Sequence, residues 1–283
     1  MKPVPAISGR LRRIEGRHNA LVKELRQAFS RGELTSSGDC AVEGFRIVEE
    51  AARSGLKCRA IFFSESAEPR AARLLPQIGS HVETLLLPDK LFASAVPSQT
   101  PQGVAALVHP KVFSFDDVME SSAQGPLLVI AGVQDPGNLG TIIRSAEAFE
   151  AKGMLLGGGT VSAYNNKVIR ASAGSAFRVA IARVELEAAI EAIRGREVRL
   201  VATSSHKGVL LQAARLDAGT AVFIGNEGAG IDKKLLGKMD ELVMIPHSPK
   251  VESLNAGIAA SIVLYEAARQ RSGTPRRHGD TEE

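Results

Sequence analysis

Three short stretches of this sequence hold polar residues at spacings that suit ligand binding and the orientation of a nucleophile. In the first, Gln134–Ala146, a Pro-Gly turn leads into Asn138, and Arg144 follows six residues later among aliphatic neighbours. A guanidinium at such a position of a helix is expected to point toward an anion or a polar substrate. The alternative is structural, because Asn138 is a good N-cap and the stretch is then only a capped turn between strand and helix.

The second stretch, Gly225–Gly230, places three glycines within six residues, directly after an apolar run. Glycine lets a backbone come close to a ligand. The pattern is not the dinucleotide-binding fingerprint, because no G-x-G-x-x-G sequence opens a helix here, and a phosphate-binding lysine motif is also missing from the sequence. A nucleotide-polyphosphate enzyme and a nucleotide-cofactor oxidoreductase are therefore disfavoured. Gly157–Gly159 is interpreted as a turn.

The third stretch, Ile245–Asn255, is expected to end a strand and to cap the last helix with Ser253 or Asn255. His247 is a candidate catalytic base, although it is more simply interpreted as a residue that caps or lines the loop. The helix that follows is almost wholly apolar as far as Leu264, which predicts a buried helix lying close to other backbone.

Hydrophobic patterning places these stretches at the carboxyl ends of strands. Leu127–Val133 is a continuous apolar run, typical of a central parallel strand covered on both faces. Further strands are expected at Gly153–Leu156, Arg178–Ala182, Val198–Ala202, Ala221–Ile224 and Leu242–Ile245, with helices at Leu139–Glu150, Lys167–Ala173, Leu186–Arg194 and Asp232–Lys238. This alternation predicts an α/β domain with a mainly parallel sheet, whose strand ends form a ligand crevice.

The first 31 residues contain eight lysines and arginines against two acidic residues. Apolar residues from Leu11 to Leu25 recur at helical spacing, which predicts an amphipathic helix whose basic face is either solvated or in contact with phosphates. A small α/β unit follows, with helices at Ala41–Gly55, Glu68–Ile78 and Pro88–Val96 and strands at Arg59–Phe63, His81–Leu87 and Gln102–Val108. Because this unit shows no carboxylates, histidines or cysteines at catalytic spacing, it is predicted to be a binding module.

Length and composition fit two domains of a globular protein, with 283 residues, 44% hydrophobic and 23% charged. We expect a basic arm and binding domain at 1–110, a linker at 111–125, the α/β domain at 126–271 and a disordered tail at 272–283. Two cysteines, Cys40 and Cys58, provide neither a disulfide framework nor a metal cluster, which favours a reducing cytoplasmic compartment. The longest apolar run, Ile258–Leu264, is too short to cross a membrane. The net charge of +4 permits an acidic partner such as nucleic acid.

The order and placement of the three stretches resemble the SpoU (TrmH-like) branch of the SPOUT RNA 2′-O-ribose methyltransferases. The family patterns N-x-G-x-I-x-R-[ST]-A, G-x-E-x-x-G-[IL] and I-P…S-L-N are complete at Asn138–Ala146, at Gly225–Ile231, and at Ile245–Pro246 with Ser253–Asn255. The resemblance covers residues 125–270. It extends weakly to Glu43–Arg46 and Gln102–Val104, which are similar to the family's substrate-binding domain, a fold shared with small kink-turn-binding ribosomal proteins.

The resemblance implies that S-adenosylmethionine binds in the crevice, within a C-terminal trefoil knot. The implied cofactor-contacting positions are Ile224, Gly225, Ile245, Pro246 and Leu254. The implied catalytic positions, for methyl transfer to a ribose 2′-hydroxyl, are Asn138, Arg144, Glu227, Ser253 and Asn255. The family assigns activation of the hydroxyl to the arginine. Because a guanidinium stays protonated, orienting the hydroxyl and its phosphate is an equally good physical role. A metal is not expected.

The resemblance also implies a homodimer, with the last helix in the interface, and an RNA substrate. The RNA contacts are expected from Arg10, Arg12, Arg13, Arg17 and Arg46. A separate N-terminal module favours 23S (large-subunit) ribosomal RNA as the substrate. The alternatives are a transfer RNA 2′-O-methyltransferase and a non-catalytic RNA-binding protein that kept the fold, and the complete polar set of the three motifs argues against the second of these.

Overall fold

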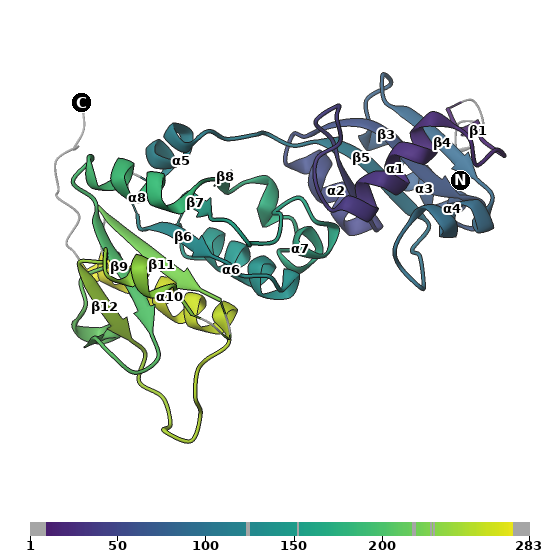
Figure 1. Ribbon diagram of the computed structural model, residues 1–283. Helices are drawn as coiled ribbons and strands as arrows, with labels where there is room; N and C mark the ends of the chain where they lie inside the picture. Colours follow the sequence, from purple (N-terminus) through teal and green to yellow (C-terminus); the bar gives the residue numbers. More distant parts are fainter. Residues whose placement is uncertain are drawn as a thin grey trace. The chain divides into compact units, whose positions relative to one another are not determined.

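The computed structural model describes residues 10–122, 125–151, 153–216, 219–226, 228 and 230–273, and the chain divides into two compact units (Figure 1). The first unit comprises Met1–Lys111 together with Ser162–Arg178, and the second comprises Val112–Val161 together with Val179–Glu283. The backbone therefore passes between the units at three points. In the described ranges no helix combines the length and the hydrophobicity that a membrane span requires.

The first unit is built on a five-stranded mixed sheet with the order β1-β4-β3-β5-β2. The strands β1, β4 and β3 run parallel, whereas β5 is antiparallel to both β3 and β2. The strands are β1 (Arg12–Arg13), β2 (Cys40–Glu43), β3 (Lys57–Ser64), β4 (Glu83–Leu87) and β5 (Val104–His109). The helices are α1 (Ala20–Arg31), α2 (Phe45–Arg53), α3 (Glu68–Leu74), α4 (Asp89–Ala95) and α7 (Asn166–Ala171).

Strand periodicity divides the side chains of this sheet between two apolar layers. In β3, Ile61 and Phe63 belong to one hydrophobic cluster, whereas Ala60 and Phe62 belong to another, and all four are fully buried. Helices α2 and α3 contribute to the first cluster, and α1 and α4 contribute to the second. The sheet is thus covered on both faces, and this explains why β3 is apolar without alternation.

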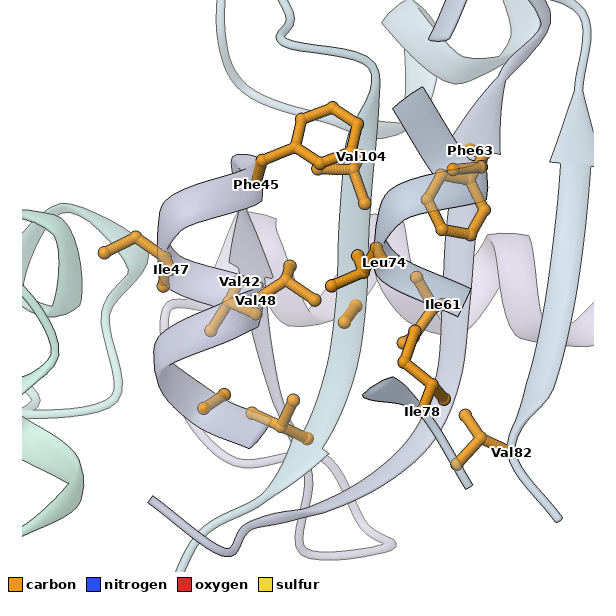
Figure 2. Packing of buried hydrophobic residues seen from close by; sticks show 14 of the residues in the cluster. Val42, Phe45, Ile47, Val48, Ile61, Phe63, Leu74, Ile78, Val82 and Val104 are labelled. Carbon is orange, nitrogen blue, oxygen red and sulfur yellow. The ribbon is translucent and has the colours of Figure 1, made fainter. Parts of the chain in front are cut away.

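A segment from the second half of the sequence completes the first unit. Figure 2 shows Val48 of α2 pointing toward Leu74, whereas Ile47 projects from the opposite side of the helix. Ile47 is nevertheless buried, and its cluster includes Ile169 of α7 and Phe177. Residues 162–178 therefore supply apolar surface to the core of the first unit.

Hydrogen bonds and a close backbone approach hold the same segment against α2. The Arg178 guanidinium donates to Glu50 Oε1 at 2.6 Å and to Ser54 Oγ at 3.0 Å. Gly174 has a φ of +89°, and a Cβ at this position would lie 2.5 Å from Glu50 Cγ. The left-handed conformation and the lack of space both favour glycine there.

The second unit is built on a seven-stranded sheet with the order β10-β12-β9-β11-β6-β7-β8, in which the strand pairs are parallel. The expectation of an α/β fold with a mainly parallel sheet is confirmed. The strands are β6 (Leu127–Ala131), β7 (Gly153–Leu156), β8 (Ala180–Arg183), β9 (Arg199–Ser204), β10 (Val209–Leu210), β11 (Thr220–Gly225) and β12 (Glu241–Met244). The helices are α5 (Phe115–Ser121), α6 (Pro136–Ala148), α8 (Leu186–Arg194), α9 (Lys233–Leu236) and α10 (Ala256–Gly273).

Helices α6 and α10 pack against each other at close range. Gly257 of α10 leaves room for Thr141 of α6, since a Cβ on Gly257 would lie 3.2 Å from Thr141 Cβ. One turn further along, Ser145 Oγ and Ser261 Oγ are hydrogen-bonded at 2.7 Å. The small residues of α10 therefore serve to bring it close to α6, as the apolar, Ala- and Gly-rich sequence predicts.

Three expected elements are wrong in position or type. The amphipathic helix does not begin near Leu11, because residues 12–13 form β1 and Asn19 caps α1 by accepting hydrogen bonds from two backbone amides. The helix expected from Ala41 begins at Phe45, since residues 40–43 pair with β5 as β2. The expected linker contains α5, whose capping box at Ser114 starts a helix there. The last helix reaches Gly273, so only part of the expected tail, residues 274–283, lies outside the described residues.

Candidate functional site

A pocket of about 370 Å³ opens at the carboxyl ends of β9, β11 and β12. Its walls come from the residues after these strands, from the loop before α10 and from the first turn of α10. From β6 the chain continues to β7 and β8 on one side of the sheet, whereas β11 is followed by β12 on the other side, so the direction changes between β6 and β11, next to the pocket. Open parallel sheets bind ligands at such a point, and the volume is within the roughly 300–1,000 Å³ of ligand pockets.

The lining of the pocket suits a ligand with both apolar and polar parts. Apolar walls are contributed by Ile224, Ile231, Ile245 and Leu254, and hydroxyl groups by Thr203, Ser204 and Ser205. Glu252 is the acidic lining residue, and none of the described lining residues is lysine or arginine. A pocket with this lining favours a neutral or cationic ligand over a polyphosphate.

The loop after β11 is closed by backbone and amide contacts. Asn226 and Gly230 exchange two backbone hydrogen bonds, at 3.1 and 3.0 Å. The Asn226 side chain donates to the Gly132 carbonyl at 2.8 Å, which fixes this loop to the one after β6. A Cβ on Gly225 would lie 2.5 Å from the carbonyl carbon of Gly230, so the loop closes this tightly only with glycine at residue 225.

The loop before α10 joins the pocket to α6. Asn255 caps α10 by accepting a hydrogen bond from the Ile258 amide at 3.1 Å, while its own amide donates to Asn138 Oδ1 at 2.8 Å. His247, which also lines the pocket, bonds through Nδ1 to the Ile245 carbonyl at 2.7 Å. The histidine therefore orders the loop, in agreement with the simpler of its two interpretations.

Asn138 does not cap α6, contrary to the structural interpretation of the first stretch. The cap is Asp135, whose Oδ1 accepts the Asn138 amide at 2.8 Å, and Pro136 occupies the first helical position. Proline is favoured there because its missing N–H has no acceptor to lose. The side chain of Asn138 instead accepts the hydrogen bond from Asn255.

Arg144 is an exposed residue of α6, six residues beyond Asn138 and therefore about 9 Å further along the helix axis. It does not line the pocket. Its guanidinium forms no hydrogen bond or ion pair with the described residues. The charge is thus available at the surface of the helix that carries Asn138.

Of the expected cofactor positions, Ile224, Gly225, Ile245 and Leu254 line the pocket and Pro246 does not. Of the expected catalytic positions, Ser253 lines the pocket, Asn255 and Asn138 meet beside it, and Glu227 lies outside the described residues. Thr203, Ser204, Ser205 and His206 also line the pocket and were not expected there. The available signal was that they follow the predicted strand Val198–Ala202, because the carboxyl ends of parallel strands share one edge of the sheet.

The expected RNA-contacting arginines all lie in the first unit, in different states. Arg10 donates to the carbonyls of Leu75, Ile78 and Gly79. Arg12 and Arg13 form exposed ion pairs with Glu83 and Glu65, whereas Arg17 and Arg46 are exposed and have no polar partner among the described residues.

The parallel sheet, the pocket at its strand ends and the separate first unit belong to a chain that matches two family models. The model of the SpoU rRNA Methylase family matches residues 125–265, and the model of the MRM3-like substrate binding domain matches residues 19–106. The chain belongs to the SpoU rRNA methylase family.

Particular relatives resemble the chain over nearly its whole length. The 23S rRNA (guanosine(2553)-2'-O)-methyltransferase RlmP of Bacillus subtilis (strain 168) is 31% identical, with 90% of this chain and 98% of the relative covered. The 23S rRNA (uridine(2479)-2'-O)-methyltransferase of Streptomyces viridochromogenes is 31% identical, with 86% of each covered. Among solved structures, the SpoU methyltransferase AviRb from Streptomyces viridochromogenes in complex with the cofactor AdoMet is 28% identical, with a TM-score of 0.77, 90% of this chain and 99% of that chain covered.

Proposed function

We propose that this chain is an S-adenosylmethionine-dependent RNA methyltransferase that methylates a ribose 2′-hydroxyl of 23S ribosomal RNA. One observation carries the proposal. The pocket at the strand ends is joined to α6 by the hydrogen bond between Asn255 and Asn138, so the proposed cofactor site and the helix that bears Arg144 form one assembly. Membership of the SpoU rRNA methylase family supports the same activity.

The pocket fits S-adenosylmethionine in its chemistry. The cofactor is a cation with an apolar purine face, and the lining offers aliphatic walls, hydroxyl groups and the Glu252 carboxylate without a described lysine or arginine. Bound there, the cofactor supplies an electrophilic methyl group whose bond to sulfur breaks as the bond to the 2′-oxygen forms. Gly225, Ile245 and Leu254 are proposed to hold it mainly through backbone groups, with Ile224 and Pro246 adjoining.

The proposed task of the chain's polar residues is to position the ribose. A 2′-hydroxyl is a weak nucleophile until it is oriented and its proton is accepted. A guanidinium does not serve as that base, so we assign the proton to solvent water and assign Arg144 to binding the neighbouring phosphate and orienting the hydroxyl. Asn138, Ser253 and Asn255 shape the pocket edge, and the family motif gives Glu227 a place in the same set.

The substrate is assigned to ribosomal rather than transfer RNA by the named relatives. The relatives from Bacillus subtilis and Streptomyces viridochromogenes both act on 23S rRNA, but one is named for a guanosine and the other for a uridine. Both are 31% identical to this chain. Overall identity therefore does not determine which nucleotide a member of this family methylates.

The proposal includes a homodimer formed through α10. Ile258 and Tyr265 are 53% and 57% exposed, and the half-buried Ile262 stands between them on the same helical face. Exposed apolar stripes of this kind mark interaction sites. We also propose a C-terminal trefoil knot, on the basis of the family resemblance. A cytoplasmic location is proposed from the same resemblance and from the two unpaired cysteines.

The test is methyl transfer from labelled S-adenosylmethionine to large-subunit ribosomal RNA isolated without modifications. Label is expected in ribosomal RNA, at a linkage that resists alkaline cleavage because the 2′-oxygen is blocked. Transfer to transfer RNA alone would replace the substrate assignment. Cofactor binding without transfer to either RNA would favour a non-catalytic RNA-binding protein.

A further inference from the structure

The positive residues around the start of α1 and α4 differ in their contacts. Arg12 and Arg13 face glutamates, and Arg10 is held by backbone carbonyls. Arg17 and Lys90, by contrast, are exposed and form no ion pair or hydrogen bond with the described residues. Charge that is already neutralised within the chain adds little to the attraction of a polyanion, so Arg17 and Lys90 matter more for binding.

Arg17 and Lys90 lie on the rim of one hollow of about 500 Å³ in the first unit. The hollow is bounded by residues before α1, by α1 itself and by the start of α4. Arg26 of α1 is its third cationic lining residue, and Glu15 is its acidic one. The carboxylate of Glu15 lies 3.8 Å from Arg13 Nε, which offsets part of its negative charge.

The third cation is fixed in place, unlike the other two. Arg26 Nε donates to the Ser94 carbonyl at 3.2 Å, and its Nη2 lies 3.4 Å from Ser94 Oγ. These bonds use one edge of the guanidinium and leave other N–H groups for a ligand. Pro88 and Leu91 add apolar surface to the same hollow. A fixed guanidinium, two exposed cations and an apolar wall suit a phosphate flanked by a ribose or a base.

We propose that this hollow, between α1 and α4, is an RNA-binding site of the first unit, in which Arg17, Arg26 and Lys90 contact backbone phosphates of the substrate RNA. This proposal rests on the proposed function, and it specifies which residues of the first unit contact the substrate RNA. The sequence predicted a basic arm in which all the arginines contact RNA. The contacts are now assigned to one local site, to which Arg12 and Arg13 contribute little.

The experiment compares two doubly charge-reversed proteins with the full-length wild type. The test variant carries Arg17→Glu and Lys90→Glu. The control variant carries Lys57→Glu and Arg73→Glu, two exposed positions of the first unit outside the hollow, so the net charge changes equally. Binding of a 23S ribosomal RNA transcript is measured by filter retention between about 50 and 200 mM salt, the range over which phosphate contacts are most evident.

The test variant is expected to bind the transcript at least about tenfold more weakly. Its salt dependence should fall by roughly 0.7–0.9 in log–log slope for each RNA phosphate that the variant no longer neutralises. Its affinity for S-adenosylmethionine should match that of the wild type, because the pocket lies in the second unit. A circular dichroism spectrum and an unfolding midpoint equal to those of the wild type show that the first unit is folded. The control variant should lose much less affinity. Equal losses in both variants would mean that overall charge attracts the RNA, and the hollow would then not be a site.

Failure of the proposed function gives a different result. If the wild type binds the transcript and the test variant does not, but neither transfers methyl groups, the hollow stands and the enzymatic assignment falls. If the wild type methylates the RNA and the test variant has an unchanged KM for RNA, the enzymatic assignment stands and the hollow falls. Arg26→Ala, with Arg26→Lys as its conservative partner, then tests whether the fixed guanidinium or charge alone matters.

Discussion

The Arg144 side chain is exposed because its neighbours on α6 make the contacts that position the helix. Ile142, Ile143 and Ala146 are buried against the rest of the unit, so the helix is positioned without any contribution from the arginine. Removal of the guanidinium is therefore expected to leave folding unchanged. It stands on the helix whose Asn138 meets Asn255 beside the pocket.

Arg144→Ala is expected to reduce kcat for methyl transfer by at least about a hundredfold, the scale seen when an electrostatic stabiliser of a transition state is removed. The free energy of unfolding should change by less than about 0.5 kcal/mol, since the side chain is exposed. Single-turnover transfer and equilibrium binding of the cofactor are the measurements. A parallel loss of cofactor affinity would show that Arg144 has a structural role. Arg144→Lys distinguishes charge from the planar geometry of the guanidinium.

Gly225→Ala tests the tight closure of the loop after β11. The added methyl group meets the Gly230 backbone at 2.5 Å, so the loop must open, and the free energy of unfolding should fall by about 1–3 kcal/mol. Cofactor affinity, followed by calorimetry, should fall as well. Gly158→Ala is the matched control, because a Cβ there meets no atom within 4 Å. Similar behaviour of the two variants would contradict the steric account.

The sequence predicts which of these residues lie around the pocket better than it predicts their contacts. Ser253 lines the pocket, and Asn138 and Asn255 meet beside it, but the cap that one interpretation gives to Asn138 is Asp135. Both residues are good caps, and Pro136 at the first helical position was the feature that separates them. The sequence could not reveal the amide contact between Asn138 and Asn255, because it joins residues 117 positions apart.

Helix α10 is attached at both ends, and Gln270 and Arg271 hold its C-terminal end, where Arg271 Nη2 donates to the Phe149 carbonyl at 2.5 Å. The Gln270 side chain accepts the Leu216 amide at 2.8 Å and donates to the Ala214 carbonyl at 2.8 Å. Glu266 lies beside it and receives two hydrogen bonds from Arg269. The bonds from Arg269 lower the pKa of the Glu266 carboxyl in spite of its burial, so the group remains charged at neutral pH.

Gln270→Ala should lower the free energy of unfolding by about 2 kcal/mol, because a buried amide and a carbonyl lose their partner. The effect is measured by urea denaturation with the m-value monitored. Gln212→Ala, at an exposed position of the same connection, should change stability by less than about 0.5 kcal/mol. A Gln270 effect as small as that of Gln212 would mean that the hydrogen bonds of Gln270 do not contribute to stability.

Elements marked by a continuous apolar run were predicted well, whereas elements that depend on pairing with a distant strand were not. Gly153–Leu156 matches β7 at both ends, because a fully apolar run between turn residues has one simple interpretation. β1 has only two residues and exists through pairing with β4, and Cys40–Glu43 can be assigned to the next helix as readily as to a strand. Asn19 was a local signal for the true start of α1 that the apolar spacing obscured.

The proposed homodimer can be tested by changing the exposed face of α10. Ile258→Glu combined with Tyr265→Glu places charge on the exposed face of α10 and should give a monomer in size-exclusion chromatography with light scattering. Val112→Glu alters an apolar residue of the same unit that is 61% exposed, and it should leave the mass unchanged. A dimer that survives the double change would place the interface elsewhere.

The division into two units was expected, but the composition of the first unit was not. Residues 162–178 follow a strand of the parallel sheet in sequence and were expected to belong to that domain. Their place in the first unit depends on Ile169 and Phe177 joining the cluster around α2, and on the bond from Arg178 to Glu50. Local patterning predicts that these residues form a helix and bury apolar side chains, but it does not say against which partner.

The three passages of the backbone between the units limit how this protein can be divided. A fragment ending at Lys111 lacks residues 162–178, and the apolar side of α2 that carries Ile47 loses part of its cover. A transplant of the first unit onto another enzyme through a single fusion point would thus carry an incomplete core. Exchange between relatives is expected to succeed only when residues 1–111 and 162–178 are transferred together, so recombination at a single point is not expected to give a stable protein.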